Sequence, residues 1–193
     1  GVKYVLTTKQ IDNPDKSGLK LIGIAPGGIY YQRQNAFPRA WIAQSISVAD
    51  DDTVRSHIAS GKDDLQSNAY VDHAVDCPAS GQPTATITDY GANSVKVNTT
   101  GGSGLLVLSD QYYPGWQATV DGQPVEIVRA DTVFRAVCVE DSGTQSPVEH
   151  VIRFEFRPPL FTIGALTSGV GWLMLTVIGA LALLLRRSPN RAS

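Results

Sequence analysis

The sequence predicts a mainly β protein: an antiparallel β-sandwich with one short helix, followed by a single C-terminal transmembrane helix. Short runs rich in Val, Ile, Thr and aromatic residues recur through residues 1–159. Gly, Pro, Asn and Asp separate them at spacings typical of a sandwich. The 26 residues 160–185 contain no Asp, Glu, Lys, Arg or His. We therefore expect a β domain at 1–159, a membrane helix at 160–185 and a basic tail at 186–193.

The apolar segment sets the expected topology. As a helix, its 26 residues would reach about 39 Å, more than the ~30 Å hydrocarbon core of a bilayer. Arg186, Arg187 and Arg191 follow it, and such a flank stays in the cytoplasm. Residues 1–159 would then be extracytoplasmic. The sequence that starts at Gly1 shows no export signal, so we expect preceding membrane segments that deliver the domain across the membrane. The chain would then be the C-terminal end of a multi-pass cell-membrane protein.

Eleven strands are expected in the β domain. Alternation of polar and apolar residues is clearest at 84–88 and 94–98, as in strands with one face in water. Asp121-Gly122 predicts a two-residue hairpin turn, because glycine accepts the positive φ of a primed turn. The expected strands are residues 2–7, 19–25, 29–32, 40–48, 84–90, 94–99, 104–109, 116–120, 125–129, 132–139 and 148–157.

One helix is expected at residues 50–61, where Asp50, Asp51 and Asp52 precede the first turn and Gly61 ends the last. Three consecutive carboxylates favour capping over calcium binding, whose ligands alternate with other residues. Residues 62–68 and 79–83 are expected to be polar connections, and the glycine-rich residues 101–104 a flexible turn. Two prolines in residues 157–161 predict a short, stiff link to the membrane helix.

Charge and cysteine content restrict the possible partners. Residues 1–159 hold all 18 acidic and 13 of the 16 basic residues, a net charge of −5 that argues against nucleic acid. Cys77 and Cys138 are an even pair, and outside the cytoplasm a disulfide closing about 60 residues could stabilise the fold by roughly 4 kcal/mol. The alternative is two unrelated buried thiols.

Metal and cofactor chemistry is not indicated by the sequence. Neither cysteine lies in a CxxC motif or beside a histidine. His57, His73 and His150 have no common spacing that would build a metal site, and we expect them at the surface or half-buried. We therefore expect no metal, no cofactor and no catalytic residue in this chain.

The densest group of candidate site residues is Asp110, Tyr112, Tyr113 and Trp116, around a Pro-Gly turn. Exposed rings beside a carboxylate could bind carbohydrate, with the rings stacking on its apolar face. The alternative is that the aromatics pack the corner of the sandwich while Asp110 anchors the turn. We expect Trp116 in the core, and Tyr112 or Tyr113 at the surface.

Residues 106–127, LVLSDQYYPGWQATVDGQPVEI, resemble the C-terminal extracytoplasmic region of the YfhO family of bacterial membrane proteins. Residues 2–6, residues 37–41 and the ending from 151 into the final span resemble family segments in the same order. The resemblance implies a polytopic protein similar to GT-C glycosyltransferases, which use lipid-linked sugars outside the membrane and are linked to cell-envelope polymers. Their catalytic acid lies in an early loop that is absent here, so the fragment alone is expected to be inactive.

The interpretation is therefore an accessory β domain and membrane anchor of a glycosyltransferase-like protein. Its expected partners are the lipid bilayer, upstream transmembrane helices of the same protein, and an envelope glycopolymer or lipid-linked sugar. Small residues four apart, such as Gly164 and Ser168, predict close packing of the span against those helices. The alternative is a non-enzymatic surface, adhesion or structural β domain with one anchor.

Overall fold

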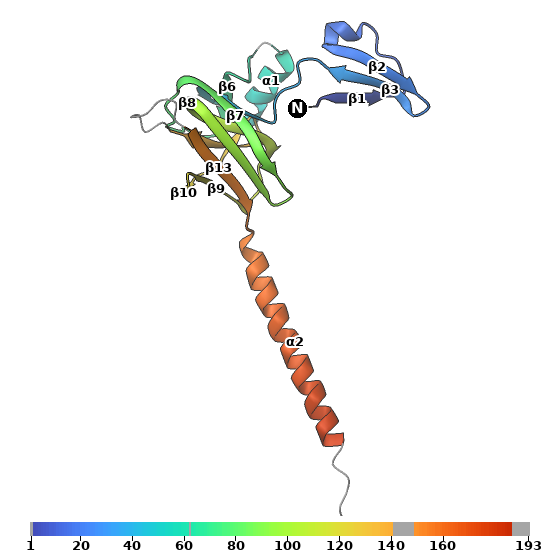
Figure 1. Ribbon diagram of the computed structural model, residues 1–193, viewed down its shortest axis with the longest axis vertical. Helices are drawn as coiled ribbons and strands as arrows, with labels where there is room; N and C mark the ends of the chain where they lie inside the picture. The colour runs from blue at the N-terminus through green and yellow to red at the C-terminus, as the bar shows by residue number, and fades with distance from the viewer. Residues whose placement is uncertain (1, 62, 141–148, 187–193) are drawn as a thin grey trace, which may run out of the picture.

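The computed structural model describes residues 2–61, 63–140 and 149–186. A β-sandwich stands on one end of the long helix α2 (Pro159–Arg186), and a small separate sheet lies beside the far end of the sandwich (Figure 1). The prediction of a mainly β fold with an apolar C-terminal helix is confirmed. The strands are β1 (Tyr4–Thr7), β2 (Leu19–Ala25), β3 (Gly28–Arg33), β4 (Ala40–Ala43), β5 (Ser45–Val48), β6 (Asn68–Val71), β7 (Ser80–Tyr90), β8 (Ser94–Gln111), β9 (Trp116–Val120), β10 (Gln123–Val125), β11 (Val128–Ala130), β12 (Phe134–Val139) and β13 (Glu149–Phe156).

The two layers of the sandwich share β8. Its first half pairs with β7 and β13, and β9 and β10 extend that layer. Its second half pairs with β4 and β12, and β11, β6 and β5 extend the other layer. These pairs are antiparallel except β5–β6, which is parallel. One long strand therefore crosses from layer to layer.

The expected flexible turn at residues 101–104 is wrong, because these residues lie inside β8. Gly102 has φ 148°, and a Cβ there would lie 2.0 Å from the carbonyl oxygen of Ser80 on β7. At Gly104 a Cβ would lie 2.7 Å from Ile42 on β4. Glycine is needed here because β8 passes so close to β7 and β4 that a side chain would not fit.

The sandwich core lies between the two layers. Val97 and Leu106 on β8, Val137 on β12, and Ile152 and Phe154 on β13 are fully buried there. A second apolar cluster, which includes Trp41, Leu105 and Val107, covers the opposite face of the β4–β8–β12 layer. Burying each large side chain contributes about 1.5–3 kcal/mol, so both clusters stabilise β8 in place.

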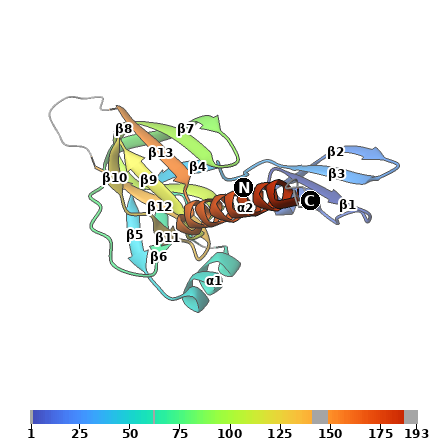
Figure 2. The same cartoon turned by 90° about the horizontal axis from the view of Figure 1, so that it is seen from below.

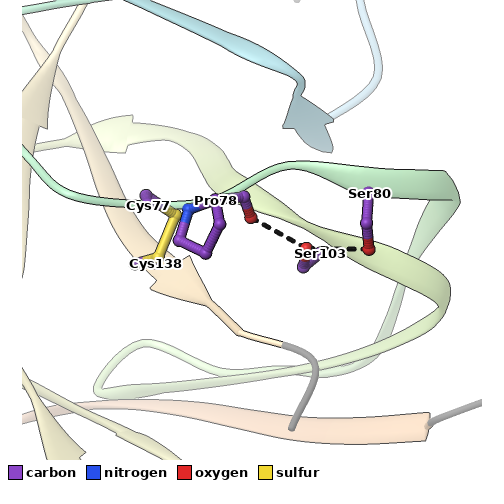
Figure 3. The surroundings of a disulfide bond; sticks show 5 residues. All are labelled: Cys77, Pro78, Ser80, Ser103 and Cys138. Carbon is purple, nitrogen blue, oxygen red and sulfur yellow. Dashed lines mark hydrogen bonds between the residues drawn. A yellow bond between two sulfur atoms is a disulfide. The ribbon is translucent and has the colours of Figure 1, made fainter. Parts of the chain in front are cut away.

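A disulfide joins Cys77, in the segment before β7, to Cys138 on β12, with their Cα atoms 5.6 Å apart (Figure 3). Beside it the hydroxyl of Ser103 donates to the carbonyl oxygen of Pro78 at 2.8 Å and contacts the hydroxyl of Ser80 at 3.0 Å. The entry to β7 is therefore fixed to both β12 and β8.

The hairpin and the helix follow the sequence closely. Asp121 and Gly122 have φ of 51° and 82° and connect β9 to β10. Helix α1 (Asp51–Ser60) is capped by Asp50, whose carboxylate accepts from the Thr53 N–H at 2.8 Å, and ends at Gly61 with φ 62°. Both predictions are confirmed.

Several strand boundaries differ from expectation. The run at 40–48 divides into β4 and β5, and the run at 125–129 divides between β10 and β11. Residues 80–83, expected as a connection, belong to β7, and β6 and the 3₁₀ helix Pro14–Ser17 were not predicted. β1, β3 and β2 form their own three-stranded sheet instead of joining the sandwich. Seen from below, this sheet projects to one side of the sandwich (Figure 2).

Helix α2 continues directly from β13. Its stretch Ile163–Leu184 is 22 residues long, with a mean hydropathy of 1.8, enough to cross a membrane. Its described apolar side chains are exposed, as expected of a helix that meets lipid or other helices.

Candidate functional site

The aromatic turn, residues 111–116, connects β8 to β9 at the end of the sandwich from which α2 leaves. Trp116 pairs with Phe156, the last residue of β13. The Arg157 N–H donates to the Gly115 carbonyl at 2.7 Å. Gly115 has φ 102°, and a Cβ there would lie 3.2 Å from the Cα of Pro158. The aromatic turn is therefore packed directly on the segment that leads into the membrane helix.

The aromatic side chains of the turn divide between surface and core. Tyr112 is 39% exposed and Tyr113 is 59% exposed. Trp116 is half-buried: it packs against the sandwich core, with its ring centroid 5.4 Å from that of Phe156. Trp116 therefore supports the fold while part of its surface stays accessible, and both tyrosines remain available to a partner.

Asp110 is the centre of a polar cluster. Arg135 donates from Nη2 at 2.9 Å and Arg39 from Nη2 at 2.5 Å, while the Tyr90 hydroxyl lies 3.0 and 3.1 Å from the two carboxylate oxygens. Both carboxylate oxygens thus have partners within the domain. Asp110 orients two arginines and a tyrosine instead of standing free to accept from a sugar.

Arg135 is the buried member of this cluster, with a side chain only 3% exposed. Its guanidinium carbon lies 3.7 Å from the centroid of the Trp116 ring, a cation–π contact. Among the described residues, its Nε and Nη1 have no hydrogen-bond partner. Burial lowers the pKa of Arg135, and the charge of Asp110 opposes this shift. Burial and the hydrogen bond to Asp110 raise the pKa of Tyr90.

Two hollows flank the aromatic turn, and Tyr113 and Trp116 line both. The larger, of about 910 Å³, is also lined by Tyr112 and by Arg153, Glu155 and Arg157 of β13 and its exit. The smaller, of about 540 Å³, is also lined by Asp110 and by Tyr90, Asn93, Gln111 and Arg135. The structure therefore brings all four candidate residues to one place, with the two shared rings as the wall between the hollows.

Sequence reasoning missed Arg39, Tyr90 and Arg135. Tyr90 comes from a distant part of the chain and carries no local signal. Arg39 lies in the segment 37–41 that resembles the family, but nothing in that segment shows that it meets Asp110. Arg135 did carry one, because it is the single charge within the apolar run 133–139. A charged residue is rarely buried in a strand unless it is paired.

The histidines form no common site. His57 contacts Asp63 at 2.5 Å, His73 contacts Asp72 at 2.7 Å, and His150 contacts Asp121 at 2.7 Å. The expectation that His150 is exposed or half-buried is wrong: it is 5% exposed, because Asp121 anchors it under the β9–β10 hairpin. In the part of the chain that the structure describes, no group of three or more His, Cys, Asp or Glu could hold a metal ion.

Fold and site together define a β-sandwich domain attached to a membrane helix. The family model described as bacterial membrane protein YfhO matches residues 72–168, which include the aromatic turn, the disulfide and the start of α2. The chain belongs to the YfhO family. Neither a search of curated proteins nor a search of solved structures found a match.

Proposed function

We propose that the chain is the C-terminal extracytoplasmic domain and anchor of a multi-pass YfhO-family protein, and that this domain holds carbohydrate for a glycosyltransferase-like reaction on cell-envelope polymers. The observation that carries the proposal is the wall formed by Tyr113 and Trp116, shared by two hollows at the end of the sandwich from which the membrane helix leaves. The disulfide and the arginines that follow the span support the extracytoplasmic side.

The chemistry of this wall suits a sugar. A pyranose ring has apolar faces that stack on aromatic rings and hydroxyl groups that need polar partners at the edge. Tyr113 offers an exposed ring, while Tyr90, about half exposed, and Asn93 and Gln111 offer polar groups at the smaller hollow. At about 540 Å³ the smaller hollow has the size of a small-molecule site, typically about 300–1,000 Å³.

These residues fit a role in holding the acceptor polymer, and not in the chemical step. General acid–base chemistry on a sugar needs a carboxyl group free to exchange a proton with it. Both oxygens of Asp110 are occupied by Arg39, Arg135 and Tyr90. The catalytic carboxylate is accordingly assigned to the upstream part of the parent protein.

Titration of the full chain in nanodiscs with envelope-derived oligosaccharides tests the proposal. We expect saturable binding that Tyr113→Ala weakens by about tenfold, the loss of roughly 1.4 kcal/mol of stacking. Tyr4→Ala is the matched control, since Tyr4 is 60% exposed on the separate N-terminal sheet. Absence of saturable binding to any oligosaccharide of the panel, or an equal loss in both variants, would reject carbohydrate binding at this wall.

A further inference from the structure

We propose that residues 112–115 of the aromatic turn, together with Arg157, lie at the outer edge of the phospholipid headgroup layer of the bilayer that α2 crosses, in contact with the headgroups. The partner is the membrane surface itself. This assignment goes beyond carbohydrate binding and does not depend on it. Tyr113 takes part in both, but the placement rests on Tyr112, Arg157 and the link between the aromatic turn and α2.

The first argument is the absence of a flexible connection between the aromatic turn and the membrane helix within the described residues. β13 ends at Phe156 and α2 begins at Pro159. The Arg157 N–H is bonded to the Gly115 carbonyl, and a Cβ at Gly115 would lie only 3.2 Å from the Cα of Pro158. The height of the aromatic turn above the bilayer is therefore set by the helix.

The second argument is the length of the helix. The 22 residues Ile163–Leu184 rise about 33 Å, which fills the ~30 Å hydrocarbon core. Pro158 precedes Ile163 by five residues, or about 8 Å of helical rise. The headgroup layer on each side of the core is about 5–8 Å thick. Gly115, in contact with Pro158, thus lies at the outer edge of that layer.

The third argument is the chemistry at this level. Tyrosine is enriched at membrane interfaces, and arginine pairs well with phosphate. Tyr112 and Tyr113 are exposed here, and the Arg157 side chain is 67% exposed. Of the described residues that line the larger hollow, Glu155 is the only acid, and Arg157 at 2.5 Å and Arg153 at 3.6 Å neutralise it.

Charge distribution along the chain agrees with this placement. The membrane-proximal residues Arg153, Glu155 and Arg157 carry a net charge of +1, whereas residues 1–159 as a whole carry −5. A domain of negative net charge thus presents cations and aromatic rings where it meets the bilayer. The β domain would then be oriented with this end facing the membrane and the N-terminal sheet away from it (Figure 1).

The chain's seven tyrosines provide the test. The full chain is labelled with 3-fluorotyrosine, placed in phosphatidylcholine–phosphatidylglycerol nanodiscs and studied by fluorine NMR, with signals assigned by single Tyr→Phe variants. One sample carries a gadolinium chelate on a lipid headgroup, and a second carries a soluble gadolinium chelate in the water. Tyr4 is the internal control, because its exposure equals that of Tyr113.

We expect the lipid-bound chelate to relax Tyr112 and Tyr113 at least about fivefold faster than Tyr4, because relaxation falls steeply with distance from the headgroups and the N-terminal sheet lies farther from α2 than the end of the sandwich that α2 leaves (Figure 1). We expect the soluble chelate to relax them at least about threefold more slowly than Tyr4, because headgroups cover the rings. Equal relaxation of Tyr113 and Tyr4 by the lipid-bound chelate would overturn the proposal, as would strong relaxation of Tyr113 by both agents. Oligosaccharide binding is read separately, from shifts of the same signals on adding sugar.

Discussion

Asp131 should make the domain less stable as the pH rises from 4 to 7. It lies in the turn between β11 and β12, is 2% exposed, and accepts one hydrogen bond, from the Tyr70 N–H at 3.0 Å. Among the described residues its Oδ2 has no partner, and the nearby Arg129 is bound to Asp51 and Asp72 instead. Burial raises the pKa of Asp131 from 3.8 to about 6.

The direction follows from proton linkage. The folded state holds the Asp131 proton more tightly than the unfolded state, so the stabilisation is complete below pH 3.8 and is lost as the pH rises through about 6. A shift of about two units corresponds to roughly 3 kcal/mol. Asp131→Asn keeps the acceptor for Tyr70 and suits the local φ of 47°, but cannot ionise.

The assay is urea unfolding of the full chain in detergent, followed by tryptophan fluorescence from pH 4 to 7.5. The free energy of unfolding of Asp131→Asn minus that of the wild type should rise by about 2.5 kcal/mol over this range, because a small part of the stabilisation is already lost at pH 4. Taking the difference removes the contributions of the other carboxylates. Asp52→Asn, which removes an exposed charge from α1, is the control. A difference that stays flat with pH would refute the reasoning.

Three further predictions concern the stability of the domain and its disulfide bond. Trp116→Ala should lower the free energy of unfolding by about 3–5 kcal/mol, because the ring packs on the core and on Arg135; a loss below about 1 kcal/mol in urea titrations would contradict this. Cys77 and Cys138 should be bonded in the purified protein, and two alkylatable thiols in non-reducing mass spectrometry would exclude the bond. Gly102→Ala should cost at least about 3 kcal/mol, because its Cβ would collide with the Ser80 carbonyl; wild-type thermal melting would be inconsistent with the crossing of β8.

Much of the fold was readable where local chemistry decides the structure. Asp50 and Gly61 specify the ends of α1, and Asp121-Gly122 specifies its hairpin, because each acts on its own backbone. The continuity of β8 could not be predicted from local sequence, because the glycines at 101–104 are typical of a turn. Only the close approach of β7 and β4 shows why glycine stands at these positions of a strand. β6 is four residues long and follows a polar stretch, so its pairing with β5 and β11 decides it.

The candidate site was predictable only in part. Its aromatic members lie within five residues of one another in the chain, so the local sequence reveals them. The residues that surround Asp110 come from positions 39, 90 and 135 and meet only because β4, β7, β8 and β12 assemble around one core. The sequence therefore indicated the aromatic residues, but only the fold shows that Arg39, Tyr90 and Arg135 occupy the carboxylate oxygens of Asp110.

The most direct test of the central claim is photo-crosslinking in the proposed full-length parent protein in its own membrane. A photoreactive amino acid replaces Gln111, which is exposed and lines the smaller hollow, and Gln34, exposed near the N-terminal sheet, serves as control. Carbohydrate binding at the aromatic turn predicts a glycan adduct at position 111, identified by mass spectrometry, and none at position 34. Folded protein with no more glycan at position 111 than at position 34 would contradict it.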